Sequence, residues 1–279
     1  DNWIWHRHTG HFSMFPVYAG KDNRPAAYSE DNVPYKAEKW LNISLKGVEE
    51  GDFAMIMGFP GSTERYMTSH EIDYMLEVDN PQRIYIRGER QKILRKWMNS
   101  NQAIRIQYDS KYARSSNYWK NSIGMSRGIE KLKVRDKKAK QEAEFQAWAN
   151  ANTLPEERYI DALSIIEESV TSCADKKATM QYLSEAFLQS VELIQVMYIQ
   201  DRNETEQFYK DFNAEVDRDV AKRMFTIYRE NNTVLPTIYQ KIDAEFGGNS
   251  DAYVDWLYDN TIFTSAECIN KLNEAENPE

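Results

Sequence analysis

The stretch Asp52-Phe-Ala-Met-Ile-Met-Gly-Phe-Pro-Gly-Ser-Thr63 marks the place where the sequence changes from one structural type to another. Its first six residues are mostly apolar and predict a strand buried on both faces, and the glycines and proline end that strand. The first 63 residues hold six of the eleven glycines and four of the eight prolines, which are typical of loops between short strands. We therefore predict that residues 1–63 are mainly β and that a different domain begins after Thr63.

Two segments upstream also predict strands. Residues 12–19 and 40–45 are short and rich in aromatic, aliphatic and β-branched side chains. Pro16 favours an edge strand or a bulge in the first of them, because proline cannot donate to a strand ladder. The mostly polar residues from Gly20 to Lys39 predict a long surface loop.

Downstream of Thr63 the sequence has the spacing of helices. Residues 62–64 have the character of a helix cap and first turn, and apolar residues then recur every three or four positions. His70 lies on this apolar stripe, so we expect it to be in the core or partly buried. Further helices are predicted over residues 82–98 and 125–151, from Pro155 onward, and over residues 179–199, 204–231, 236–246 and 251–258. The fold class is therefore α+β, with a short β part followed by a large α-helical domain over residues 64–279.

Composition and charge limit the kinds of binding partner that the protein can have. The net charge of −9 argues against nucleic acid, because phosphate binding requires a basic surface. No apolar run reaches the roughly 20 residues of a membrane-spanning helix, so we predict no membrane span. Cys173 and Cys268 are too few for a disulfide scaffold, and their spacing leaves open whether they pair or stay free.

Three of the four histidines cluster at the start of the sequence. His6, His8 and His11 stand beside two tryptophans, and such a spacing could present imidazoles to a zinc ion. The remaining ligand set is incomplete, so we predict no metal site. P-loop, G-x-G-x-x-G and G-x-S-x-G motifs are absent from the sequence, so we predict no cofactor and find no nucleophile motif.

One stretch in the helical part, residues 112–121, places amide and hydroxyl side chains beside large aromatic ones. This mixture is typical of a recognition surface. The alternative, favoured on residue types alone, is a helix start with Ser115 or Ser116 as the N-cap.

Four motifs resemble the bacterial dipeptidyl-peptidase seven and eleven family of serine peptidases. They are Asp1-Asn-Trp-x-Trp-x-Arg-His-Thr-Gly-x-Phe-Ser13, Asp31-Asn-Val-Pro-Tyr35, Gly58-Phe-Pro-Gly-Ser-Thr-x-Arg-Tyr66 and Ser116-Asn-Tyr-Trp-Lys120. Members of this family have a chymotrypsin-like double β-barrel with a large helical domain inserted into it. The resemblance implies that residues 1–63 are part of the catalytic barrel and that residues 64–279 are a helical lid. The chain would then be an internal fragment, with the catalytic histidine before Asp1 and the nucleophilic serine after Glu279.

The resemblance also assigns candidate site residues. Asn2, Trp3 and Asn117 match family positions that hold the free amino terminus of a peptide substrate. Carbonyl oxygens and an aromatic wall suit an ammonium group, which donates hydrogen bonds and is attracted to a ring face. The implied function is release of dipeptides in the periplasm or another exported location, and the oligomeric state, including a homodimer, is left open.

One departure from the family affects catalysis. His11 stands where the family has the aspartate of the catalytic triad, and His6 stands where it usually has proline. A neutral histidine can accept the hydrogen bond of the catalytic imidazole but supplies no negative charge. Three functions therefore stay open: a serine-type dipeptidyl peptidase, a non-catalytic peptide-binding descendant, and, as the least favoured, a zinc hydrolase that uses the histidine cluster.

Overall fold

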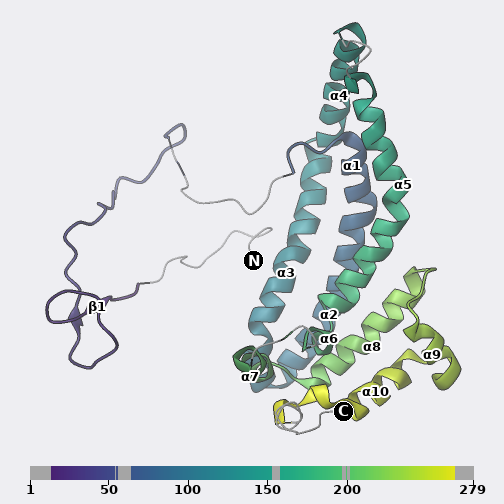
Figure 1. Ribbon diagram of the computed structural model, residues 1–279. Helices are drawn as coiled ribbons and strands as arrows, with labels where there is room; N and C mark the ends of the chain where they lie inside the picture. Colours follow the sequence, from purple (N-terminus) through teal and green to yellow (C-terminus); the bar gives the residue numbers. More distant parts are fainter. Residues whose placement is uncertain are drawn as a thin grey trace. The chain divides into compact units, whose positions relative to one another are not determined.

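The computed structural model describes residues 14–53, 55, 64–152, 158–196, 199 and 202–267. The contacts between residues divide the described part of the chain into two units, and the boundary falls between Arg65 and Tyr66 (Figure 1). The boundary predicted after Thr63 lies outside the described residues and stays a prediction.

The first unit is mainly irregular where it is described. Its strands β1 (Tyr18–Ala19) and β2 (Val33–Pro34) pair antiparallel, and Tyr18 lies opposite Pro34. The loop between them is closed by Asn23, whose side chain donates to the carbonyl oxygen of Lys36 at 2.9 Å and accepts from the Lys36 backbone N–H at 2.8 Å. Asn23 has a left-handed backbone (φ 65°), which asparagine tolerates better than most residues.

The strand predictions for this unit are largely wrong among the described residues. Only Tyr18 and Ala19 of the segment 12–19 form a strand, and none of the segment 40–45 does. Leu41, Ile43 and Leu45 are 89%, 87% and 96% exposed, so their apolar side chains are left without a covering layer. An isolated strand leaves its backbone hydrogen-bonding groups unpaired, which explains why β-forming composition alone does not produce a strand here.

The second unit is helical and confirms the predicted α+β fold class with a large helical part. Its first half consists of long antiparallel helices, drawn side by side in Figure 1. In chain order they are α1 (Ser69–Tyr74), the π-helical turn η1 (Met75–Asp79), α2 (Asn80–Ser100), α3 (Gln102–Lys131), α4 (Val134–Asn152), the 3₁₀ turn η2 (Arg158–Asp161), α5 (Ala162–Leu183) and the π-helical turn η3 (Ser184–Leu188).

The second half of this unit is built from shorter helices. They are α6 (Glu192–Val196), α7 (Arg202–Lys210), α8 (Ala214–Asn231), α9 (Ile238–Phe246), α10 (Ser250–Asn260) and the 3₁₀ turn η4 (Ile262–Thr264). None of the helices that the structure describes is long and apolar enough to cross a membrane.

The first helix begins later than the sequence predicted. Residues 64–68 are not helical, and Thr68 caps α1 in a capping box with Glu71. The backbone N–H and the hydroxyl of Ser69 both donate to the carboxylate of Glu142 on α4, at 2.6 and 2.5 Å. The sequence Thr68-x-x-Glu71 is a typical capping signal, and it places the helix start correctly where residues 62–64 do not.

The predicted helix over residues 125–151 is two helices. The break between α3 and α4 lies at Leu132 and Lys133, where Lys133 has a left-handed backbone (φ 49°), and α4 continues in the general direction of α3 (Figure 1). No glycine or proline marks this break, so a continuous charged helix was the natural prediction.

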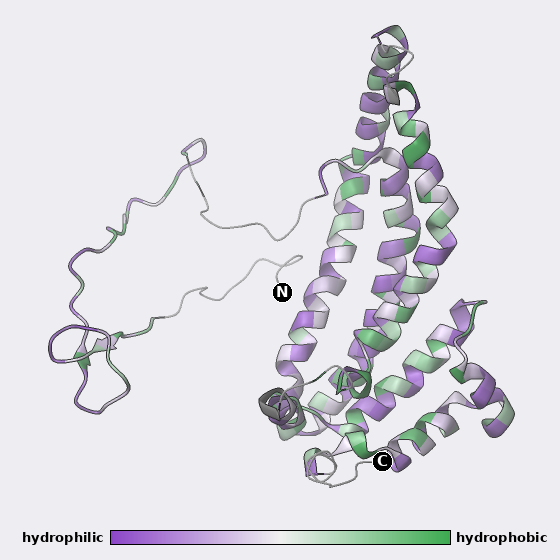
Figure 2. Ribbon diagram, viewed as in Figure 1, coloured by the Kyte–Doolittle hydropathy of each residue, from purple (hydrophilic) through white to green (hydrophobic). Residues whose placement is uncertain are grey.

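The apolar core of the helical unit lies around α8. Val216, Val220, Met224 and Ile227 are at most 1% exposed and recur every three or four residues along this helix. Phe187 of η3 packs on Phe225 with ring centroids 4.9 Å apart and nearly perpendicular. Figure 2 shows the contrast between α8, with prominent hydrophobic residues, and the largely hydrophilic α4. This core fixes the second half of the unit against the end of the long helices.

Candidate substrate-binding site on helix α3

Asn117 lies in the middle of α3 and is partly buried. The helix has its N-cap at Asn101, whose side chain accepts from the backbone N–H of Ala103 at 2.8 Å. Ser115 and Ser116 are buried inside the helix, so the prediction that one of them caps a helix is wrong. The stretch 112–121 is therefore a continuous helical surface that faces its neighbours with polar and aromatic groups.

Helices α2 and α3 meet along a contact that we call the polar seam. Asn80 Nδ2 donates to Ser126 Oγ at 3.0 Å, and Arg83 Nη1 donates to Ser122 Oγ at 3.4 Å. Each step of three or four residues forward along α2 is matched by a similar step backward along α3. The seam consists of Asn80, Arg83, Ile84, Arg87 and Gly88 on α2 and of Tyr118, Trp119, Ser122 and Ser126 on α3.

Trp119 makes the closest link between the two helices near Asn117. Its indole Nε1–H donates to the backbone carbonyl oxygen of Ile84 at 2.9 Å. A Cβ atom at Gly88 would lie 3.4 Å from that nitrogen. The indole thus lies against the backbone of α2, and a Cβ atom at position 88 would be in van der Waals contact with it.

The other neighbour of Asn117, Tyr118, is held by a buried ion pair. The guanidinium of Arg87 lies 4.9 Å from the centroid of the Tyr118 ring. Arg87 Nε donates to Glu185 Oε2 at 2.7 Å, and Arg83 Nε donates to Glu185 Oε1 at 3.2 Å. Glu185 belongs to η3 and its side chain is 9% exposed, so this carboxylate joins α2, α3 and the end of α5 in a low-dielectric setting.

A second polar cluster lies deeper, where α6 meets α8. Asp217 is fully buried, and its carboxylate accepts from the backbone N–H groups of Glu192 and Leu193 at 2.8 Å each and from the Tyr258 hydroxyl at 2.6 Å. Burial and then the charge of Glu192 raise the pKa of Asp217 to about 7, although the three hydrogen bonds oppose this shift. Lys111 from α3 pairs with Glu192 Oε2 at 2.5 Å. This cluster ties α3 to the apolar core.

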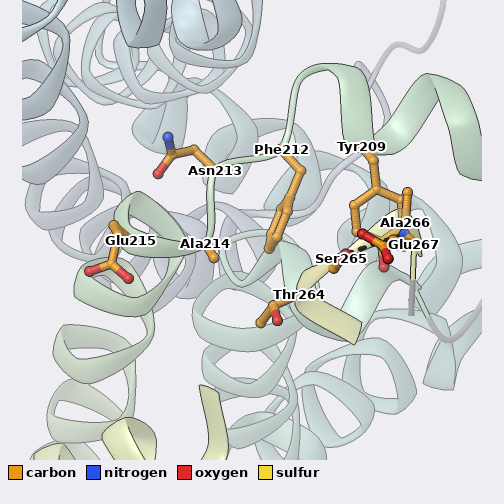
Figure 3. Close-up of a pocket in the computed structure, with 9 residues that line it drawn as sticks. All are labelled: Tyr209, Phe212, Asn213, Ala214, Glu215, Thr264, Ser265, Ala266 and Glu267. Carbon is orange, nitrogen blue, oxygen red and sulfur yellow. Dashed lines mark hydrogen bonds between the residues drawn. The ribbon is translucent and has the colours of Figure 1, made fainter. Parts of the chain in front are cut away.

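An open hollow near the end of the described chain is lined by both aromatic and polar side chains (Figure 3). Its volume is 460 Å³, and its lining residues are Tyr209, Phe212, Asn213, Ala214, Glu215, Thr264, Ser265, Ala266 and Glu267. The Tyr209 hydroxyl donates to the Phe263 carbonyl oxygen at 2.8 Å, which fixes one wall. No residue that the sequence predicted as functional lines this hollow.

The other predicted site residues fall outside the described part of the chain. This holds for Asn2, Trp3 and His11, and for the rest of the histidine cluster. His70 is partly buried, as predicted, and its Nε2 lies 3.6 Å from Glu167 Oε2 on α5. In the described residues no group of three histidine, cysteine or carboxylate side chains could hold a metal ion.

The two cysteines differ in what the structure describes. Cys173 on α5 is partly buried and forms no disulfide within the described residues, and Cys268 lies outside them.

The sequence predicted Asn117 as a site residue but gave no indication of the residues that contact its neighbours. Arg87 and Glu185 are 98 positions apart, so no local pattern connects them. A usable signal does exist in α3, where residues 108, 112, 115, 119, 122 and 126 alternate steps of four and three. This spacing is typical of a helix seam, although here it is filled mainly by polar and aromatic residues instead of aliphatic ones.

Comparison with known families assigns the class of protein. The profile of the family described as Peptidase S46 matches residues 1–205, which is most of the chain. The chain therefore belongs to the peptidase S46 family, as the four motifs predicted.

Individual relatives share most of this chain but are much longer. Dipeptidyl-peptidase 7 of Phocaeicola vulgatus is 44% identical over 300 residues, which cover 98% of this chain and 41% of the relative. Dipeptidyl-peptidase 7 of Porphyromonas gingivalis is 40% identical, and the match covers 94% of this chain and 39% of the relative. The Asp/Glu-specific dipeptidyl-peptidase of the same organism is 36% identical, with 95% and 40% covered. The chain thus spans about two fifths of the length of these curated relatives.

Solved structures agree with this assignment. The crystal structure of Porphyromonas endodontalis DPP11 in complex with the dipeptide Arg-Glu matches with a TM-score of 0.79 at 32% identity, covering 100% of this chain and 43% of that one. The same protein in an alternate conformation matches with a TM-score of 0.62 at 28% identity, and the match covers 100% of this chain and 40% of that one.

Proposed function

We propose that this chain serves in a serine-type dipeptidyl peptidase that releases dipeptides from the free amino terminus of peptides. In this proposal residues 1–63 belong to the catalytic β-barrel and residues 64–279 form a helical lid, and the protein acts in the periplasm or another exported location. The observation that carries the proposal is the match along nearly the whole chain to relatives named dipeptidyl-peptidases, at up to 44% identity. A related protein has also been crystallised with a dipeptide.

Recognition of the substrate amine falls to Asn2, Trp3 and Asn117. A peptidase that removes two residues must measure their length from the charged amine, so it needs fixed acceptors for the ammonium group. The amide oxygen of asparagine is such an acceptor, and the face of tryptophan attracts a cation. The position of Asn117 between Tyr118 and the buried Ser116 supports this role, because a rigid helix gives a more precise site than a loop.

Catalysis in this proposal is weakened at His11. The acid of a serine-peptidase triad orients the imidazole and stabilises the positive charge that it gains during acyl transfer. Replacing that acid by a neutral amide in chymotrypsin-like enzymes lowers turnover about 10⁴-fold. A neutral His11 would leave the imidazolium without this stabilisation.

The test uses the full-length protein and fluorogenic dipeptidyl amides with a free amine. His11→Asp is expected to raise kcat by about 100-fold or more, because it restores the missing negative charge. His8→Asp serves as the matched control and should not raise kcat.

Asn117→Ala is expected to raise KM for the same substrates by about tenfold, because one charge-assisted hydrogen bond is lost. Activity that neither substitution alters, in a protein shown to be folded, would refute the proposed site.

A second candidate, a non-catalytic peptide-binding protein, is favoured by one observation: a histidine at position 11 in place of a carboxylate. Such a protein would keep the effect of Asn117 on the binding of free-amine peptides. It would gain no hydrolytic activity from His11→Asp. The two substitutions together therefore separate the enzyme from the binding protein.

A further inference from the structure

We propose that Trp119 is a positioning residue for Asn117, and that the missing side chain at Gly88 allows it to act. This inference rests on the proposed function, in which Asn117 holds the substrate amine. Trp119 itself would not touch the substrate.

The first step is the contact between the indole and the backbone of α2. In an α-helix each side chain leans toward the N-terminus and covers the turn before it. The residue at position 88 would therefore cover the carbonyl of Ile84, one turn earlier. Because that residue is glycine, no side chain lies between the indole and this carbonyl, and Trp119 Nε1 donates to it at 2.9 Å.

The second step is what this hydrogen bond fixes. A helix moves about 1.5 Å and turns about 100° per residue, so a link to the backbone of α2 sets both the height and the rotation of α3 at this point. The bond is to a main-chain atom, which cannot change rotamer as a side-chain partner can. Asn117 is only two residues away on the same rigid helix, so its position follows that of Trp119.

The third step is that the rest of the polar seam constrains α3 less closely. Ser122 and Ser126 are small, and their hydrogen bonds from Arg83 and Asn80 are 3.4 and 3.0 Å long. Tyr118 is 51% exposed and contacts Arg87 through its ring face, which tolerates sliding. Trp119 is therefore the large side chain that sets the register of α3 beside Asn117.

The consequence concerns selectivity for a free amine. A misplacement of about 1 Å weakens a directional hydrogen bond and can lower catalysis substantially. Removal of the indole N–H should therefore reduce the preference for a free amine without removing Asn117 itself.

The experiment measures binding of dipeptides to the full-length protein by titration calorimetry. The probes are Ala-Leu and Arg-Glu, and the one that binds more tightly is compared with its N-acetylated form. The ratio of the two dissociation constants, acetylated over free, is the readout. It reports recognition of the amine and is insensitive to a general loss of folded protein.

The variants are Trp119→Phe, Asn117→Ala and the double substitution, with Trp97→Phe as the matched control. Trp97 also donates an indole hydrogen bond between helices, to Asp219 Oδ2 at 2.9 Å, but it lies at the other end of α2. We expect Asn117→Ala to lower the ratio about tenfold and Trp119→Phe about threefold, while Trp97→Phe leaves it unchanged. The double variant should fall no further than Asn117→Ala, because Trp119 acts through Asn117.

Each outcome decides between the inference and the proposed function. A fall with Asn117→Ala but not with Trp119→Phe, or an equal fall with Trp97→Phe, overturns the positioning role and leaves the proposed function intact. Additive losses in the double variant would mean that Trp119 acts independently of Asn117, which also overturns it. Equal binding of free and acetylated dipeptides by the unsubstituted protein would refute the proposed amine recognition and the positioning role with it.

Discussion

Helices α2 and α3 meet beside Asn117 through arginine, serine and aromatic side chains, whereas α8 packs through a continuous apolar face. Polar contacts depend on direction and distance, so they favour one register of the two helices over its neighbours. Apolar contacts depend mainly on the area removed from water, so they contribute more stability and less direction. The comparison suggests a division of roles within the helical unit, between stabilising the fold and positioning side chains. We propose that the core around α8 stabilises the fold and that the polar seam positions the candidate site.

The largest change in the free energy of unfolding should come from a substitution that leaves a cavity in the core. Met224→Ala on α8 removes a fully buried side chain and should lower the free energy of unfolding by about 2–5 kcal/mol. Ser122→Ala in the polar seam removes one long hydrogen bond and should cost about 1 kcal/mol. Urea denaturation of both variants measures the difference. Equal losses would show that the two regions do not divide the tasks in this way.

The free energy of unfolding should depend on pH through Asp217, which lies on α8 in the cluster that ties α3 to the apolar core. The pKa of this carboxyl is raised from 3.8 to about 7 in the folded chain, so the folded state binds the proton more tightly than the unfolded state. The stabilisation is therefore present below pH 3.8 and is lost as the pH rises through 7. The charged groups that interact with it are Glu192 and Arg90, together with the hydroxyls of Tyr108 and Tyr258, and Lys111 pairs with Glu192.

Asp217→Asn should flatten this part of the pH dependence of the free energy of unfolding. The control is Asp219→Asn, two residues further along the same helix. It should leave the pH dependence of the free energy of unfolding in place. Urea titrations between pH 4 and pH 8 make the measurement. A dependence that survives Asp217→Asn would assign it to other groups.

The smallest change in the free energy of unfolding comes from a comparison of two glycines, one in each of the paired helices. A Cβ atom at Gly124 or Gly128 of α3 would meet no atom within 4 Å. Gly124→Ala should therefore raise the free energy of unfolding by about 0.5–1 kcal/mol, because alanine favours the helix. Gly88→Ala should gain less, since its Cβ would contact the indole of Trp119 at 3.4 Å. Thermal denaturation of the two variants tests this, and an equal gain would mean that the indole has room to move.

Helix content was predictable from the sequence because most helices carry an apolar face or a capping signal. The first half of α3 was not predicted, and the helix start at Ser69 was misplaced. In α3 the residues that contact α2 include Ser122 and Ser126, so hydrophobic periodicity does not reveal the contact. The break at Lys133 carries no glycine or proline, so the local sequence contains no signal for it.

Strands were predicted less well than helices. A helix satisfies its own backbone, but the segment 40–45 needs a second strand that residues near it in sequence do not supply. The candidate site shows the same limit. Asn117 was identified through a family motif, whereas the roles of Gly88, Arg87 and Glu185 depend on contacts between distant segments.

The central claim is that Asn117 on α3 holds the amino group of the substrate. The most direct test is a crystal structure of the full-length protein with a bound dipeptide, in which the distance from Asn117 Oδ1 to the terminal nitrogen is measured. The account predicts a hydrogen bond of about 3 Å. A terminal nitrogen bound elsewhere, beyond direct or single-water contact with Asn117, would contradict it.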